Sequence, residues 1–148
     1  KGTLYSIDYP AYPSKGGYTS LNPFGVKGKD NLILLPEDCE PGWVVPDELK
    51  NNWNLRLGKS SEQLIPLLQD VGKIDFFLHD SLHSYENMFF EFEEAFKYMN
   101  KKGIILADNI NWNTSFYDFC FEKGLSPLTY LAYTIDPSLA HPFGVAKV

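Results

Sequence analysis

Two stretches of the sequence decide the fold: IDFFLHDSLHSYE at residues 74–86 and GIILADN at residues 103–109. Each begins with a nearly unbroken apolar run and then reaches an acid, Asp80 in the first and Asp108 in the second. Apolar runs of this kind are typical of strands that are covered on both faces in a parallel sheet. Between the two runs, residues 84–99 carry apolar side chains at helical spacing. We therefore expect a strand, a helix and a second strand of a parallel sheet.

The predicted helix at residues 84–99 has an apolar side and a charged side. Its charged residues are expected to face water, and its apolar residues are expected to form part of the core. The expected water-facing residues are Glu86, Glu91, Glu93, Glu94 and Lys97, and the expected core residues are Met88, Phe89, Phe92, Ala95, Phe96 and Met99.

Strands and helices also alternate on either side of this unit. A β-prone run at residues 3–8 ends in Asp8, and residues 9–46 are so rich in Pro and Gly that they indicate mostly loop, with a short strand at 32–35. Further elements are predicted as a helical turn at 46–51, a strand at 53–57, a helix at 60–71, a helix capped by Asn113 that ends at Lys123, and a closing hairpin of strands at 126–135 and 142–148. The pattern predicts a Rossmann-like, doubly wound α/β fold with a mostly parallel sheet, helices on both faces and antiparallel closing strands.

The length and composition of the chain limit the kinds of protein to which it can belong. Its 148 residues suit one domain, and a formal net charge of -6 argues against nucleic acid as a partner. Cys39 and Cys120 match no metal or disulfide pattern, which fits a cytoplasmic protein with ordinary thiols. The apolar runs are too short to span a membrane. The sequence leaves the oligomeric state open, with a homo-oligomer among the alternatives.

Three predicted strands end in a carboxylate, at Asp8, Asp80 and Asp108. In open α/β sheets, ligands bind beyond the carboxyl ends of the strands. Because neighbouring strands lie about 4.8 Å apart, carboxylates at adjacent strand ends can converge on one ligand or cation. An Asp after a strand often caps the next helix instead, but three equivalent positions favour a ligand site.

The two deciding stretches, taken with GWVVPDE at residues 42–48, resemble the class I methyltransferases that depend on S-adenosylmethionine (SAM) and whose fourth strand ends in D-x-x-H-S/T-Y-E. The glycine-rich loop that follows the first strand in this family has no counterpart in the sequence and would precede Lys1. The resemblance implies that residues 1–148 are a single methyltransferase domain that is truncated at its N-terminus and lacks its first strand.

The resemblance also implies which residues bind SAM. Asp8 matches the acid that accepts hydrogen bonds from the ribose hydroxyls, and Gly58 to Ser60 match the turn that holds the adenine ring. Asp80 would lie near the sulfonium and the methyl acceptor, with Asp108 on the far side of the pocket. Ser60 can equally cap the following helix without contacting a ligand.

A metal site and a general base are further expectations at the same sheet edge. Asp80, Asp108 and Asn109 resemble the Mg²⁺ ligands of catechol-type O-methyltransferases, in which the cation lowers the pKa of the acceptor hydroxyl. The three side chains can instead form a hydrogen-bonded cluster without metal. His83 is a candidate general base, with capping of the strand-to-helix turn as the alternative, whereas His79 is expected to be structural.

The resemblance therefore implies an enzyme, a SAM-dependent O-methyltransferase that acts on a hydroxyl of a small molecule or a sugar. Two alternatives stay open: a reaction of the cephalosporin-hydroxylase-like relatives of the fold, and a catalytically inactive interaction module. The sequence does not identify the acceptor, because acceptor pockets are built from variable loops.

Overall fold

The computed structural model describes residues 2–9, 39–132 and 141–148, and the chain divides into two compact units, Lys1–Gln63 and Leu64–Val148. The strand predicted at residues 32–35 and the hairpin connection at residues 136–138 lie outside the described residues. Within the described part of the chain, every helix is too short or too polar to cross a membrane.

The first unit contains a pair of parallel strands. Strand β1, Leu4–Asp8, pairs with β2, Trp53–Leu57, in a register that runs from Leu4 opposite Trp53 to Asp8 opposite Leu57. The Trp53 indole donates a hydrogen bond of 3.0 Å to Ser6 Oγ, which ties the two strands together through their side chains. A short 3-10 helix, η2 (Asp47–Asn52), leads into β2 where the sequence predicts a helical turn.

Helix α1, Ser60–Val71, spans the division between the two units and has the predicted bounds. It buries Leu64, Leu67 and Leu68 on one side. Pro66 lies inside the helix on its exposed side. Glu62, whose carbonyl loses its partner to this proline, is also an exposed residue, and water can replace the missing hydrogen bond at such a position.

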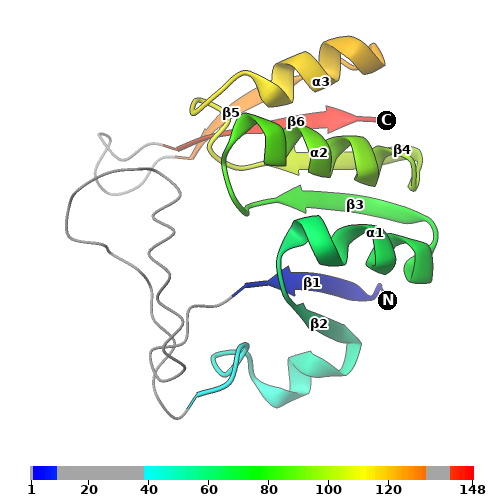
Figure 1. The fold of residues 1–148 in the computed structure, drawn as a ribbon, viewed down its shortest axis with the longest axis vertical. Coiled ribbons are helices and arrows are strands. Elements are labelled where there is room, and N and C mark those ends of the chain that lie inside the picture. Colours follow the sequence, from blue (N-terminus) through cyan, green and yellow to red (C-terminus); the bar gives the residue numbers. More distant parts are fainter. Residues whose placement is uncertain (1, 10–38, 133–140) are drawn as a thin grey trace. The chain divides into compact units, whose positions relative to one another are not determined.

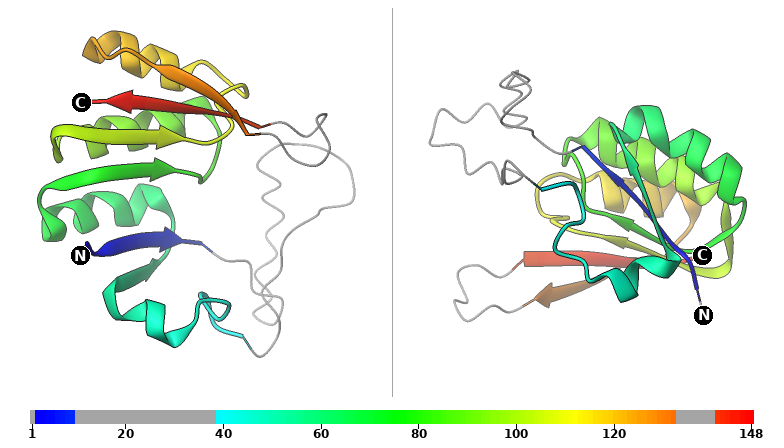
Figure 2. Two further views of the ribbon diagram at one scale, coloured as in Figure 1. Left: turned by 180° about the vertical axis from the view of Figure 1, so that it is seen from behind. Right: turned by 90° about the horizontal axis from the view of Figure 1, so that it is seen from below.

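The second unit is built on a four-stranded sheet with the strand order β3-β4-β6-β5 (Figure 1). Strands β3 and β4 are parallel, and β6 is antiparallel to both β4 and β5; the left view of Figure 2 shows β6 running against β3 and β4. The bounds are Ile74–His79 for β3, Met99–Ala107 for β4, Leu128–Ala132 for β5 and His141–Lys147 for β6. The predicted fold class and the antiparallel closing strands are confirmed.

Helices α2, Tyr85–Phe96, and α3, Ser115–Lys123, pack against each other, and α2 also packs on β3 and β4. Ser84 caps α2 by accepting a hydrogen bond from the Asn87 N–H, and the Asn113 side chain accepts from Ser115 N at the start of α3. The buried core of this unit is Met88, Phe92, Met99, Ile105, Ala107, Ile110, Phe116, Phe119, Cys120 and Ala146.

Three details of the second unit differ from the sequence prediction. Met99 belongs to β4 and not to the preceding helix, because it pairs with Ile74 beside an irregularity in the β3 register. Glu91, expected to face water, is only 3% exposed. Phe76 and Leu78, expected to be covered, are 53% and 50% exposed, because they alternate with the β3 residues that face α2.

The backbone of Gly144 in β6 lies so close to α3 that a side chain at this position should lower the stability of the protein. A Cβ at this position would overlap the ring of the buried Phe116 in α3. We therefore expect Gly144→Ala to lower the free energy of unfolding by about 1–3 kcal/mol, measured by urea denaturation. The cost should be smaller in a Phe116→Leu background, where the side chain can move aside, and equal costs in both backgrounds would contradict the close approach.

Candidate functional site

The parallel pairing of β3 and β4 places two carboxylates at neighbouring strand ends. His79, the last residue of β3, lies opposite Ala107, the last residue of β4, and Asp108 N donates a hydrogen bond of 3.0 Å to His79 O. Asp80 and Asp108 are the next residue after each strand. The expected convergence of these two acids at one sheet edge is therefore confirmed.

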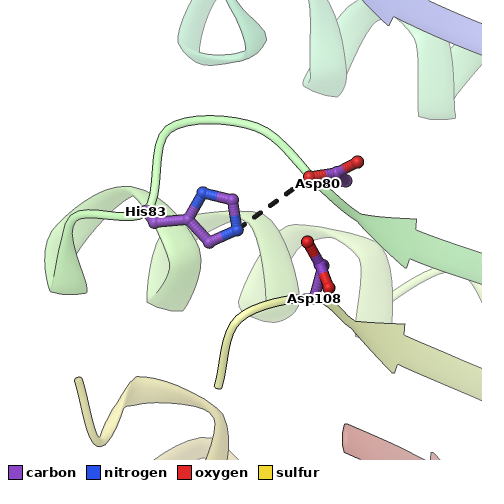
Figure 3. A group of neighbouring side chains, drawn as sticks. All are labelled: Asp80, His83 and Asp108. Atoms are coloured by element: carbon purple, nitrogen blue, oxygen red, sulfur yellow. Dashed lines mark ion pairs between the residues drawn. The ribbon is translucent and has the colours of Figure 1, made fainter. Parts of the chain in front are cut away.

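A histidine completes this group. The side-chain ligand atoms of Asp80, His83 and Asp108 all lie within 4.8 Å of one another, and His83 Nε2 is 4.0 Å from Asp80 Oδ1. Figure 3 shows the imidazole of His83 extending from the loop after β3 toward the two carboxylates. The group thus combines two hydrogen-bond acceptors with one atom that can either accept a proton or ligate a cation.

The imidazole of His83 is enclosed, with a side chain that is only 7% exposed. The rings of His79 and Trp112 each lie 5.0 Å from the His83 ring, and Asn113 Nδ2 donates to the His83 carbonyl. Among the described residues, His83 Nε2 has no hydrogen-bond partner. This atom, buried beside two carboxylates, therefore has an unused hydrogen-bonding position in the described part of the chain.

Burial changes the titration of His83. It lowers the pKa of the imidazole below its usual value of 6.5, and the neighbouring His79 lowers it further. The carboxylates of Asp80 and Asp108 raise the same pKa, but their effect is smaller. The neutral form of His83, which can accept a proton, is therefore favoured at neutral pH.

Asn109 lies beside the group and points at Asp108. Its side-chain amide donates a hydrogen bond to Asp108 Oδ2, and its backbone has a φ of 50°. Of the residues that the sequence predicts as metal ligands, the structure brings Asp80 and Asp108 together with His83, while Asn109 is bonded to Asp108.

In the first unit, Asp8 and the predicted adenine-binding turn are neighbours. Gly58 N donates a hydrogen bond of 2.8 Å to the Asp8 carbonyl, where β1 and β2 end side by side. Gly58 has a φ of 143°, which favours glycine, and Ser60 begins α1. The Asp8 side chain is exposed, so its carboxylate is accessible to a ligand.

Sequence reasoning missed Glu91, which bonds to His79 next to the site. The spacing held a signal that could have found it: Glu91 lies three residues after Met88 and four before Ala95, and these intervals place it on the core face of α2. The prediction that His79 is structural is confirmed, since the side chain is buried and hydrogen-bonded.

Comparison with known proteins identifies the family. Residues 2–110, more than half of the chain, match the model of a family described as a methyltransferase domain. Over 57 residues the chain is 33% identical to a probable polyketide synthase 22 of Dictyostelium discoideum, a segment that is 38% of this chain and 2% of that protein.

Solved structures agree in fold. The chain is similar to the O-methyltransferase of Bacillus cereus in complex with SAH, with a TM-score of 0.54, 17% identity and coverage of 68% of this chain and 52% of that one. It is also similar to an O-methyltransferase of Streptomyces achromogenes that is involved in tomaymycin synthesis and was solved with SAM, with a TM-score of 0.50, 11% identity and coverage of 68% and 52%. The chain thus spans about half the length of these proteins. Together, the family match and the Rossmann-like sheet show that this chain belongs to the family of methyltransferase domains.

Proposed function

We propose that this protein transfers a methyl group from SAM to a hydroxyl oxygen of a small molecule or a sugar. The observation that carries the proposal is the group of Asp80, His83 and Asp108 at the carboxyl end of the sheet in a methyltransferase-family chain. Two structurally similar proteins are O-methyltransferases that were solved with SAH and with SAM, which supports SAM as the cofactor.

In this proposal, residues of the first unit bind the nucleoside part of SAM. The Asp8 carboxylate accepts hydrogen bonds from the ribose hydroxyls, and Gly58 and Ser60 contact the adenine. The support is that Asp8 is exposed and that its carbonyl is bonded to Gly58 N, so the two contacts lie side by side. Asp80 is proposed to lie near the sulfonium, where a carboxylate favours positive charge.

His83 is proposed as the general base. An acceptor hydroxyl that donates its hydrogen bond to Nε2 would lose its proton to the imidazole while its oxygen attacks the SAM methyl carbon. The bond from that carbon to sulfur breaks, and S-adenosylhomocysteine leaves as a neutral thioether. The support is that His83 is buried and that its Nε2 has no hydrogen-bond partner in the described part of the chain.

A divalent cation is a second proposed component of this site. The carboxylates of Asp80 and Asp108 fit a hard cation such as Mg²⁺, since they approach each other at one sheet edge. Asn109 is the proposed third ligand, through the amide oxygen that its bond to Asp108 leaves unused. A bound cation would lower the pKa of the acceptor hydroxyl. The alternative is a hydrogen-bonded cluster that holds no metal.

Binding of SAM tests the cofactor proposal. Isothermal titration should show that the purified protein binds SAM and that Asp8→Asn raises the dissociation constant about 10-fold or more, because a charged acceptor is lost. The matched control is Asp47→Asn, which removes an exposed surface acid of the same unit and should leave the affinity unchanged. Failure to bind SAM, both by residues 1–148 and by a longer chain that includes the glycine-rich loop expected before Lys1, would favour the interaction-module alternative.

Substitution of His83 tests the base. His83→Gln should lower kcat about 10²-fold or more, whereas His141→Gln, an exposed histidine in β6, should not. Because the pKa of His83 is lowered, the proton-accepting form persists below pH 6.5. In the unaltered protein, kcat/KM should therefore fall only as the pH drops below 6.5. An acidic limb at or above pH 6.5, or a fully active His83→Gln protein, would contradict this role.

Titration with Mg²⁺ or Mn²⁺ tests the cation. If the ion binds at this site, Asp80→Asn and Asp108→Asn should each weaken its binding at least 10-fold, because each removes a charged ligand. The control is Asp118→Asn, an acid of α3 that accepts from Thr114. Equal cation affinity in all four proteins would leave the metal-free cluster as the explanation for these residues.

A further inference from the structure

Glu91 is a buried acid within the apolar face of α2. It is 3% exposed, and its neighbours Met88 and Phe92 are completely buried. Moving a carboxylate out of water is strongly unfavourable unless hydrogen bonds compensate for the lost hydration. The hydrogen bonds of Glu91 therefore indicate why a carboxylate is buried at this position.

Each oxygen of the Glu91 carboxylate contacts a different part of the chain. Oε2 lies 2.7 Å from His79 Nδ1, at the end of β3. Oε1 accepts hydrogen bonds from Ser81 Oγ at 2.6 Å and from Asn87 Nδ2 at 2.9 Å. The carboxylate thus joins α2 to the end of a strand and to the loop that follows it.

These contacts surround the candidate site. His79 and Ser81 are the residues on either side of Asp80, so one carboxylate holds both flanks of that site residue. Asn87, which is bonded to Glu91, also donates to the Leu82 carbonyl at 3.0 Å, directly before His83. The backbone from the end of β3 to His83 is therefore attached to α2 through Glu91 and its partner Asn87.

We propose that Glu91 is a positioning residue that holds the Asp80 to His83 loop in place through its bonds to His79 and Ser81. This inference rests on the proposed function of Asp80 and His83. Glu91 does not itself contact the reacting atoms in this scheme. It acts by fixing the segment that carries them, and it orients the His79 ring that lies 5.0 Å from the ring of His83.

The proposed role requires the Glu91 side chain to be an ionised carboxylate, as well as to have the right shape. An ionised carboxylate only accepts hydrogen bonds, so it selects the His79 tautomer with the proton on Nδ1 and directs the Ser81 hydroxyl toward itself. A glutamine has the same shape but only one acceptor oxygen. Its NH₂ group would either meet the two donors Ser81 and Asn87, which breaks that side of the link, or face His79, whose Nδ1 must then lose its proton to accept the bond.

The experiment compares Glu91→Gln with Glu93→Gln, which removes a neighbouring, partly buried acid that pairs with Lys123 of α3. Imidazole nitrogen NMR is a suitable first readout, because the chain has only three histidines and each signal can be assigned by substitution. Glu91→Gln should change the His79 tautomer pattern and shift the His83 signals, whereas Glu93→Gln should leave both unchanged. A second variant, Ser81→Ala, should shift His83 while keeping the His79 proton on Nδ1.

The second readout is kinetic. Glu91→Gln should lower kcat about 10-fold or more while the protein remains folded, and Glu91→Asp should restore part of the loss because it keeps an accepting carboxylate. Unchanged His83 signals in both Glu91→Gln and Ser81→Ala would overturn the inference, whatever the activity. If the signals shift as expected but the unaltered protein has no methyltransferase activity, the proposed function fails and the structural link stands. If Glu91→Gln does not fold, the Ser81→Ala protein provides the test, through the shift of its His83 signals.

Discussion

The parallel pairing of β3 and β4 is the constraint on which the candidate site depends. A parallel pair brings the carboxyl ends of both strands to one edge, and the hydrogen bond from Asp108 N to His79 O continues the pairing one step beyond the strands. Asp80 and Asp108 become neighbours for this reason, although 27 intervening residues separate them in the chain. An antiparallel pairing of the same two strands would have placed the acids at opposite edges.

Strand pairing alone does not place His83, which lies on a loop. Loops carry functional residues in many folds, but a loop side chain needs contacts that restrict it. Here those contacts are polar and come from outside the loop: Glu91 and Asn87 of α2 bond to it, and Asn113 donates to the His83 carbonyl. The rings of His79 and Trp112 enclose the imidazole, and their presence explains why its pKa lies below the usual value.

The core of the second unit lies on the α2 and α3 side of the sheet, and this side has close contacts that leave little room for substitution. Gly144 lies against Phe116, and Ala107 and Ala146 are completely or almost completely buried. Small residues on β4 and β6 allow large aromatic side chains of the helices to approach the sheet. On the opposite side, a cross-strand row of apolar residues runs from β3 to β5 and includes the half-exposed Leu78 and Leu128.

The sequence by itself determined the fold class and most element bounds. Periodicity and capping residues are local signals, so β2, α1 and the end of α3 at Gly124 could be predicted closely from them. The acids at the strand ends were also predictable, because strand order places them at one edge. The family resemblance then supplied the chemistry, which fold alone does not determine.

Only the tertiary structure decided which polar residues are buried and what they contact. Because Glu91 is charged, the sequence predicts it on the water-facing side of its helix. In the structure, its two carboxylate oxygens contact His79 and Ser81, which lie 12 and 10 residues away in the chain. The residue type of Asn109 suggests a metal ligand, but in the structure its side-chain amide donates a hydrogen bond to Asp108. Likewise, the apolar pattern of β3 indicated burial on both faces, while Phe76 and Leu78 are half exposed. The physical reason is the same in each case: hydrogen bonds and coverage depend on residues that are distant in sequence, and local patterns carry no information about those partners.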